Sequence, residues 1–277
     1  MYKKAILSIA VLVAAIAFYG FMSLDVITVK GSDTMVILAQ RWAETYQAKH
    51  PGVQIRVSGG GSGTGISALI NGSTDICDAS RSMTAAEKNS LKQRFGSPGV
   101  EVRAARDGVT IYLNPSNPVK QLSMSQLKGI FTGQITNWSQ VGGRAGRIIL
   151  YGRENSSGTY GFFKEHVLKG QDFASSTQTL PGTSAIVNAV VKDPNGVGYG
   201  GFGYSKGVHV CGVSATDGGA VYTPSEETVR NGTYPISRFL YIYLKNRPTG
   251  ELKNYIDWIL SDEGQKVVRQ AGYFPIK

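Results

Sequence analysis

The chain alternates between short apolar runs rich in β-branched residues, which are typical of strands, and longer amphipathic runs, which are typical of helices. This pattern predicts strands at 26–29, 53–57, 74–79, 100–105, 109–113, 148–151, 208–213 and 239–244. It predicts helices at 35–49, 65–70, 84–94, 125–131, 160–164, 184–191, 251–260 and 262–270. Because strands and helices take turns along the chain, we expect an α/β fold with mostly parallel sheets.

The order of these elements fits two lobes. The 277 residues suffice for two bodies of ordinary domain size. We expect the chain to begin in one lobe, to cross near residue 107 and to return near residue 206. Residues 25–107 and 207–277 would then form lobe I, and residues 108–206 lobe II. Two crossings make a hinge that can close around a ligand.

The first 24 residues indicate export. Lys3-Lys4 precede an apolar run over 5–22, as in a signal peptide. The run is also long enough for a retained membrane anchor, and both alternatives stay open. We expect the rest of the chain in the periplasm or at the outer face of the cytoplasmic membrane.

The phrase Ser-Gly-Thr occurs twice in the same setting, at 62–64 and at 157–159. Each copy follows a predicted strand and opens a predicted helix. A helix N-terminus carries unpaired N–H groups and a partial positive charge, so it attracts anions. The repeat therefore indicates two lobes that close on one small oxyanion.

Four segments in all combine hydroxyl, glycine or arginine residues with a strand end, at 31–34, 59–65, 79–82 and 153–159. Ligands of open α/β sheets bind beyond the carboxyl ends of the strands, where these segments would lie. Arg81 and Arg153 each offer a planar fork to an oxyanion. Taken singly, Ser32 and Ser80 are also ordinary helix caps and Arg153 an ordinary surface residue. Their joint occurrence favours a binding site.

This set of motifs closely resembles the periplasmic phosphate-binding proteins, the substrate-binding subunits of phosphate ABC transporters. The matching motifs are Gly-Ser-Asp-Thr-Met (31–35), Gly-Gly-Gly-Ser-Gly-Thr-Gly (59–65), Asp-Ile-x-x-Ala-Ser-Arg (75–81), Arg-Glu-x-x-Ser-Gly-Thr (153–159) and Ser-Asp-Glu-Gly-Gln-Lys…Ala-Gly-Tyr-x-Pro (261–275). The resemblance implies a two-lobed fold of the type II binding-protein class, with the ligand in the cleft. It also implies capture of inorganic phosphate and delivery to a membrane permease that a separate ATPase drives.

The expected phosphate ligands follow from these motifs and loops. They are Ser32, Asp33, Thr34, Met35, Ser62, Gly63, Thr64, Ser80, Arg81, Arg153, Ser157, Gly158 and Thr159. One position departs from some members of the family, which place an aspartate where this chain has Arg81. Such a carboxylate accepts the hydrogen of bound phosphate and repels sulfate. Asp33, Asp78 and Glu154 are the candidates for that role here, and sulfate binding stays an alternative.

Other function classes find little support. The formal net charge is +10, but the Lys and Arg residues are scattered, so we expect no nucleic-acid partner. Position 64 is Thr, so no Gly-x-Ser-x-Gly elbow surrounds Ser62, and the three histidines show no metal-binding spacing. We therefore expect a monomeric binding protein with no catalytic residues, metal or cofactor. A phosphate sensor or surface protein on the same fold stays an alternative.

The two cysteines leave a choice open. Cys77 and Cys211 lie far apart in the sequence. An exported chain can join such a pair in a disulfide or keep both as buried thiols.

Overall fold

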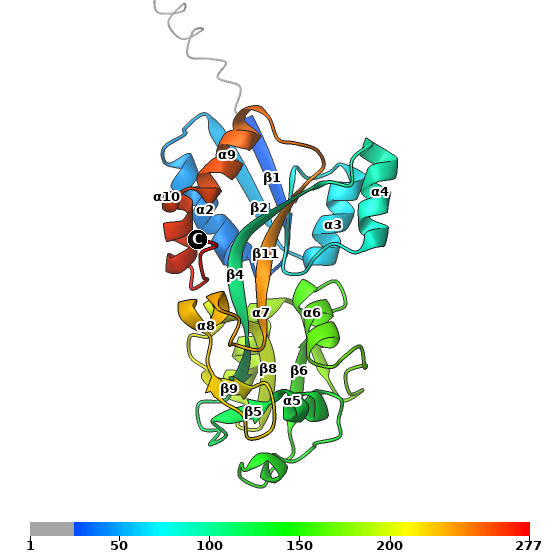
Figure 1. Ribbon diagram of the computed structural model, residues 1–277, viewed down its shortest axis with the longest axis vertical. Helices are drawn as coiled ribbons and strands as arrows, with labels where there is room; N and C mark the ends of the chain where they lie inside the picture. The colour runs from blue at the N-terminus through cyan, green and yellow to red at the C-terminus, as the bar shows by residue number, and fades with distance from the viewer. Residues whose placement is uncertain (1–24) are drawn as a thin grey trace, which may run out of the picture.

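The protein consists of two bodies that are joined by long strands (Figure 1). The structure, a computed structural model, describes residues 25–277. We call the body that holds β1 (Asp25–Gly31) lobe I and the body that holds β6 (Ile149–Arg153) lobe II. The predicted leader, residues 1–24, lies outside the described residues. Across residues 25–277, no helix combines the length and the apolar character that a membrane span requires.

Lobe I is built on the parallel strands that the sequence predicts. β1 lies between β2 and β3 and pairs with both in parallel. Each of these strands leads into a helix, and the last two helices of the chain return to pack beside the first. The elements are β2 (Val53–Ser58), β3 (Ile76–Ala79), α2 (Val36–Gln47), α3 (Ser62–Asn71), α4 (Ala85–Phe95), α9 (Gly250–Leu260) and α10 (Asp262–Gln270).

Two long antiparallel strands, β4 (Val100–Leu113) and β11 (Ser237–Leu244), connect the lobes (Figure 1). The sequence pattern predicts two strands here, 100–105 and 109–113, with a break between them. The structure has one continuous strand instead. The break does not form because Asp107 meets a buried partner, Arg238 of β11, at 2.8 Å.

Lobe II mixes parallel and antiparallel pairs. β8 and β9 pair antiparallel with residues 109–113 of β4. β6 pairs in parallel with β7 and β8. The remaining elements are β5 (Gln121–Ser123), β7 (Gln178–Leu180), β8 (Gly196–Gly201), β9 (His209–Ser214), β10 (Val221–Tyr222), α5 (Met124–Phe131), α6 (Gly158–His166), α7 (Gly182–Lys192), α8 (Glu226–Arg230) and the short 3-10 helices η1 (Trp138–Val141) and η2 (Phe202–Tyr204). The predicted two-lobed α/β architecture is thus confirmed.

Each lobe buries its own hydrophobic core, and the cores show where the chain changes lobe. Trp42 and Ile256 belong to the core of lobe I, whereas Phe163, Cys211 and Tyr234 belong to the core of lobe II. The chain beyond residue 206 therefore stays with lobe II for some thirty residues. We propose that it crosses first near residue 107 and returns along β11, rather than near residue 206.

The cysteines lie in different lobes. Cys77 packs under α3 in lobe I, and Cys211 lies in the core of lobe II. Both are buried free thiols, so the structure shows no disulfide between Cys77 and Cys211.

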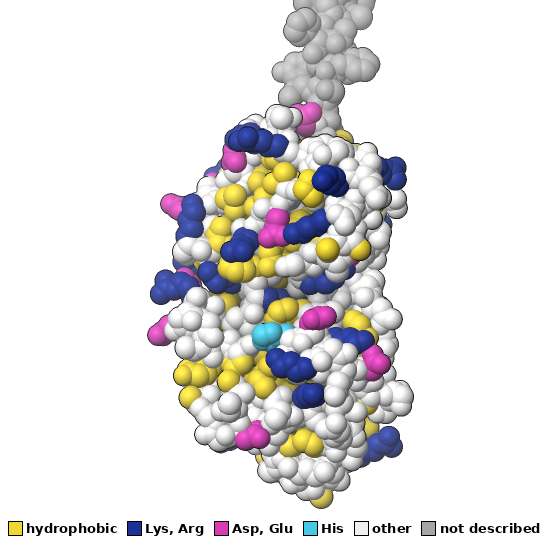
Figure 2. Space-filling view, turned by 45° about the vertical axis from the view of Figure 1, so that its right-hand side comes forward, with side chains coloured by type: hydrophobic (Ala, Val, Ile, Leu, Met, Phe, Trp, Pro, Cys, Tyr) yellow, Lys and Arg dark blue, Asp and Glu magenta, His cyan; other side chains and the backbone are white. Residues whose placement is uncertain are grey.

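The basic residues form no single stripe on the face in Figure 2, where Lys and Arg side chains are spread over both lobes among acidic and apolar ones. Positive charge is therefore diffuse on this face (Figure 2). Such a charge attracts anions over a distance but defines no binding site by itself.

Candidate functional site

The first and third predicted loops meet at the carboxyl end of the lobe I sheet. The main-chain N–H of Ser32 donates to the carbonyl oxygen of Asp78 at 2.9 Å, and the Ser32 hydroxyl donates to the Ser80 hydroxyl at 2.9 Å. Gly31 makes this approach feasible, because a Cβ there would lie 2.0 Å from the Asp78 carbonyl oxygen. The two loops therefore bring Ser32 and Ser80 together.

The second loop adds the start of α3. Ser62 is the first residue of that helix, and its hydroxyl accepts from the main-chain N–H of Ser80 at 3.0 Å. The side-chain hydroxyls of Ser62 and Ser80 lie 3.3 Å apart. Ser32, Ser62 and Ser80 are all buried, so lobe I presents three hydroxyls in one desolvated place.

Lobe II places the start of α6 against these serines. Ser157 caps this helix, because its side chain accepts from the N–H of Tyr160. The next residue, Gly158, lies so close that a Cβ would come within 2.2 Å of the Ser62 hydroxyl and 2.7 Å of the Ser80 hydroxyl. The N-terminus of α6 thus faces lobe I directly, as the repeated Ser-Gly-Thr predicts.

Thr159 completes the contact between the lobes. Its hydroxyl lies 2.8 Å from the hydroxyl of Thr34, which is 125 positions earlier in the sequence. Both threonines are buried. We call the five side-chain hydroxyls of Ser32, Thr34, Ser62, Ser80 and Thr159 the hydroxyl cluster. These groups can each donate to an oxyanion, and α6 adds its main-chain N–H groups.

Arg153 connects the lobes beside the hydroxyl cluster. Its buried guanidinium donates to Asp33 of lobe I at 2.7 Å. Within lobe II it donates to Glu154 and to the Thr183 hydroxyl, each at 3.0 Å. The alternative of an ordinary surface arginine therefore does not apply.

Arg81 does not reach the hydroxyl cluster. Its guanidinium forms a two-pronged ion pair with Glu87, at 2.7 and 2.9 Å, and donates to the carbonyl of Ser82 at 3.0 Å. Burial works against the charge of Glu87, but hydrogen bonds from Arg81 and Thr84 outweigh it and lower the pKa of that carboxyl. The third loop thus contributes its serine, and its arginine is paired on the side of α4.

The remaining predicted positions support the loops in other ways. The N–H of Gly63 donates to the carbonyl of Ser156 across the lobes at 2.8 Å. The Thr64 hydroxyl donates to the carbonyl of Gly60 in its own loop at 2.7 Å. The side chain of Met35 is fully buried in the core of lobe I. None of these three residues contributes a side chain to the hydroxyl cluster.

The candidate proton acceptors lie in three different environments. The carboxylate of Asp33 accepts from Arg153 and from the N–H of Gly60 at 2.8 Å, and Glu154 accepts from Arg153. Asp78 is buried and lines a small cavity in lobe I together with apolar side chains such as Trp42 and Ile242. Burial raises the pKa of Asp78 to about 7. Asp33 and Glu154 thus neutralise Arg153, and Asp78 is enclosed by apolar groups.

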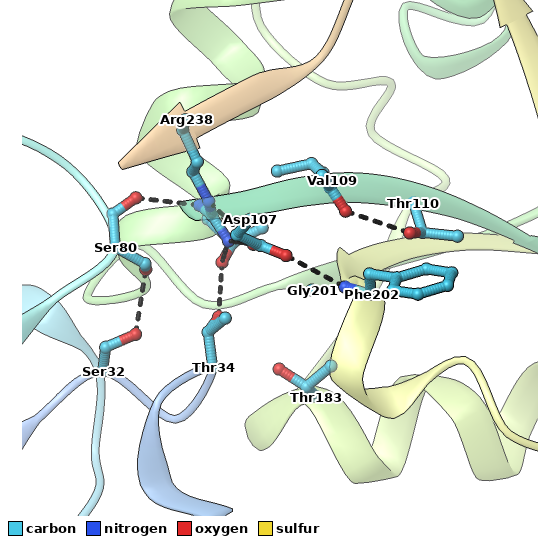
Figure 3. Close-up of polar contacts among 12 residues, drawn as sticks. Ser32, Thr34, Ser80, Asp107, Val109, Thr110, Thr183, Gly201, Phe202 and Arg238 are labelled. Carbon is cyan, nitrogen blue, oxygen red and sulfur yellow. Dashed lines mark hydrogen bonds and ion pairs between the residues drawn. The ribbon is translucent and has the colours of Figure 1, made fainter. Parts of the chain in front are cut away.

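Two site residues were missed at the sequence level. Arg238 of β11 donates to Asp107 of β4 and to the carbonyl of Ser80 at 2.8 Å (Figure 3). It also donates to the hydroxyl of Thr159 at 3.1 Å. A signal existed in the sequence: in the alternating strand 237–244, Arg238 shares the buried face with Leu240 and Ile242. A charge at such a position requires a buried partner.

Comparison with known proteins places the chain in a defined group. Residues 22–263 match the family model described as a PBP superfamily domain. The phosphate-binding protein PstS of Pseudomonas aeruginosa is 35% identical over 263 residues, which cover 89% of this chain and 81% of that protein. The phosphate-binding protein PstS of Bacillus subtilis is 32% identical over 251 residues, with 90% and 80% covered.

Solved structures agree with this placement. A substrate-binding protein from Clostridium perfringens with bound phosphate superimposes with a TM-score of 0.82 at 32% identity, covering 91% of this chain and all of that one. An ABC-type phosphate transport receptor from Vibrio cholerae gives a TM-score of 0.71 at 31% identity, with 90% and 99% covered.

Proposed function

Because this chain belongs to the PBP superfamily and, within it, to the PstS family of phosphate-binding proteins, we propose that it captures inorganic phosphate between its lobes. We propose further that it is exported and passes the phosphate to an ABC-type importer with a separate ATPase. The observation that carries the proposal is the hydroxyl cluster, in which loops of both lobes meet at hydrogen-bonding distance. Five hydroxyls and a helix N-terminus suit a small ligand with many acceptor oxygens.

The proposed ligands are the hydroxyl cluster, the N-terminal N–H groups of α6 and the guanidinium of Arg153. A charge-assisted hydrogen bond contributes roughly 1.5–3 kcal/mol, so a few of them suffice for the ~8 kcal/mol of micromolar binding. Asp33 and Glu154 hold the guanidinium in one orientation from both sides. Phosphate would therefore bind to groups whose positions the fold has already set.

We propose that no chemistry follows binding. The hydroxyl of Ser62 contacts Ser80, and the described residues place no histidine or carboxylate in hydrogen-bonding contact with it. A serine without such a base remains a weak nucleophile. Incubation with a chromogenic phosphate ester tests this point, and turnover that disappears in Ser62→Ala would contradict it.

Calorimetric titration of the phosphate-free protein with phosphate, arsenate, sulfate and molybdate tests the proposal itself. We expect heat with phosphate and with arsenate, which has the same shape and also carries a proton at neutral pH. No heat with phosphate, together with clear binding of another oxyanion, would overturn the assignment. A phosphate sensor would bind in the same way, and phosphate uptake by cells that lack this protein separates transport from sensing.

A further inference from the structure

The strands between the lobes carry a buried ion pair. Arg238 and Asp107 have side chains that are 3% and 0% exposed, and they lie on β11 and β4, the strands that connect the lobes. Asp107 accepts from the Nε and Nη2 atoms of Arg238 at 3.0 and 2.8 Å, and from the N–H of Phe202 at 3.0 Å. The guanidinium is therefore held from one side in a fixed orientation.

The other side of the guanidinium faces the hydroxyl cluster. Its Nη2 atom donates to the hydroxyl of Thr159 at 3.1 Å. Its Nη1 atom donates to the carbonyl of Ser80 at 2.8 Å (Figure 3). One contact reaches the α6 segment of lobe II, and the other reaches the third loop of lobe I. An oxyanion bound by the hydroxyl of Thr159 would thus lie next to this cation.

Arg238 also keeps hydrogen-bonding capacity for a ligand. A guanidinium has five N–H groups. Four hydrogen bonds to Asp107, Ser80 and Thr159 are formed. The fifth N–H, on Nη1, forms no hydrogen bond to residues 25–277. The bond to Thr159 can be exchanged for one to an anion, since the hydroxyl can itself donate to that anion. Two N–H groups are therefore available.

The two arginines that the sequence singles out, Arg81 and Arg153, differ from Arg238 in what their guanidinium groups contact. Arg81 is paired with Glu87, and Arg153 is paired with Asp33 and Glu154. Of these three guanidinium groups, that of Arg238 is the one in hydrogen-bonding contact with the hydroxyl cluster.

We propose that Arg238, oriented by Asp107, binds the oxyanion directly and takes the role that the sequence assigns to Arg81. This inference rests on the proposed phosphate binding. It makes the strands between the lobes part of the ligand site, since one side chain would contact the anion and both lobes. Ligand binding and closure of the lobes would then share the same residue.

The test must separate ligand binding from folding, because removal of one partner of a buried ion pair destabilises the fold. We compare Arg238→Gln, Asp107→Asn and the double variant, which removes both charges and so restores a neutral interior. Arg81→Gln is the matched control for loss of a loop arginine. Phosphate affinity is measured by calorimetry, and the unfolding temperature is measured without ligand.

We expect Arg238→Gln to lower phosphate affinity about 100-fold, as loss of two charge-assisted hydrogen bonds implies. Asp107→Asn keeps the guanidinium and an acceptor for it, so the loss should stay below about tenfold. The double variant should recover most of the unfolding temperature of the wild type while its affinity stays low. Arg81→Gln should bind within about twofold of the wild type, because the half-buried guanidinium of Arg81 is paired with Glu87 and does not contact the hydroxyl cluster.

Wild-type affinity in the double variant would overturn the inference, and so would equal losses in Arg238→Gln and Asp107→Asn. If the double variant does not fold, Arg238→Lys tests direct binding of the anion instead. Lysine keeps the ion pair with Asp107 but lacks the planar guanidinium. Its affinity should fall about tenfold, and an unchanged value contradicts a direct contact. Absence of phosphate binding by the wild type would instead refute the proposed function itself.

Discussion

The two lobes contribute different chemistry to the same site. Lobe I provides neutral groups, the hydroxyls of Ser32, Ser62 and Ser80, which hold one another in place through hydrogen bonds within the lobe. Lobe II provides a helix N-terminus and the charge of Arg153, whose partner Asp33 lies across the interface. The neutral half of the site is thus organised by one lobe, whereas the charged half depends on contact between both.

This difference has an energetic consequence. One hydrogen bond from a hydroxyl to a charged ligand contributes roughly 1.5–3 kcal/mol, whereas a buried charge left without its partner costs about 3–5 kcal/mol. We therefore expect ligand affinity to depend more strongly on lobe II and on the interface than on any single hydroxyl of lobe I. Three predictions test this expectation.

The largest effect should follow from Arg153→Ala. This variant removes the guanidinium that we propose as a ligand and leaves Asp33 and Glu154 without their partner. We expect phosphate affinity to fall at least 100-fold by calorimetry. Ser62→Ala, the comparison from lobe I, should lose about tenfold, the lower end of what one hydrogen bond to a charged ligand contributes. Equal losses in the two variants would show that the lobes do not differ in this way.

Gly158→Ala should give an intermediate effect, because its Cβ would lie 2.2 Å from the Ser62 hydroxyl and keep the lobes apart. We expect roughly tenfold weaker phosphate binding, the loss that ~1.4 kcal/mol of poorer lobe contact produces. Gly161→Ala in the same helix is the matched control, since a Cβ there would make an ordinary contact of 3.4 Å with Arg81. If both variants bind like the wild type, close approach at Gly158 is not required.

The smallest effect on binding, but a visible one on stability, should come from Asp78→Asn in lobe I. Burial raises the pKa of Asp78 from 3.8 to about 7. Between about pH 4 and pH 7, the carboxyl of Asp78 therefore keeps its proton in the folded protein but loses it in the unfolded chain. The stability of the wild type should fall as the pH rises from about 4 to about 7, by at most about 4 kcal/mol, and stay level above that range.

Asn is neutral at every pH, so the variant should escape this loss. Its unfolding temperature should exceed that of the wild type by several degrees at pH 8, and the difference should shrink toward pH 4. Asp257→Asn is the control, because the side chain of Asp257 is 58% exposed. A difference that does not change with pH would show that Asp78 keeps an ordinary pKa.

Local sequence signals identified much of the site because they act over short distances. Ser32, Ser62 and Ser80 each follow a strand of one sheet, and the ends of neighbouring parallel strands necessarily lie together. The Ser157 cap and the start of α6 follow from the same strand-to-helix pattern. Arg81 does not follow this pattern. Its guanidinium is held by Glu87, six positions later, which also completes the capping box of α4.

The long-range partners could not be predicted. Asp107 and Arg238 are 131 positions apart, and only the pairing of β4 with β11 brings them together. The same pairing explains why β4 passes through Arg106-Asp107-Gly108 without a turn. The proposed return of the chain along β11, rather than near residue 206, likewise rests on β9 pairing with β4 in lobe II.

The sequence by itself determined the succession of strands and helices, the two Ser-Gly-Thr helix starts and the family resemblance, because each depends on neighbouring residues. The tertiary structure decided which charges meet. It directs Arg81 away from the cluster, sets Arg153 between two carboxylates and brings Arg238 to the hydroxyl of Thr159. The physical reason is that a buried charge must have a partner, and strand pairing and lobe contact determine which partner lies within reach.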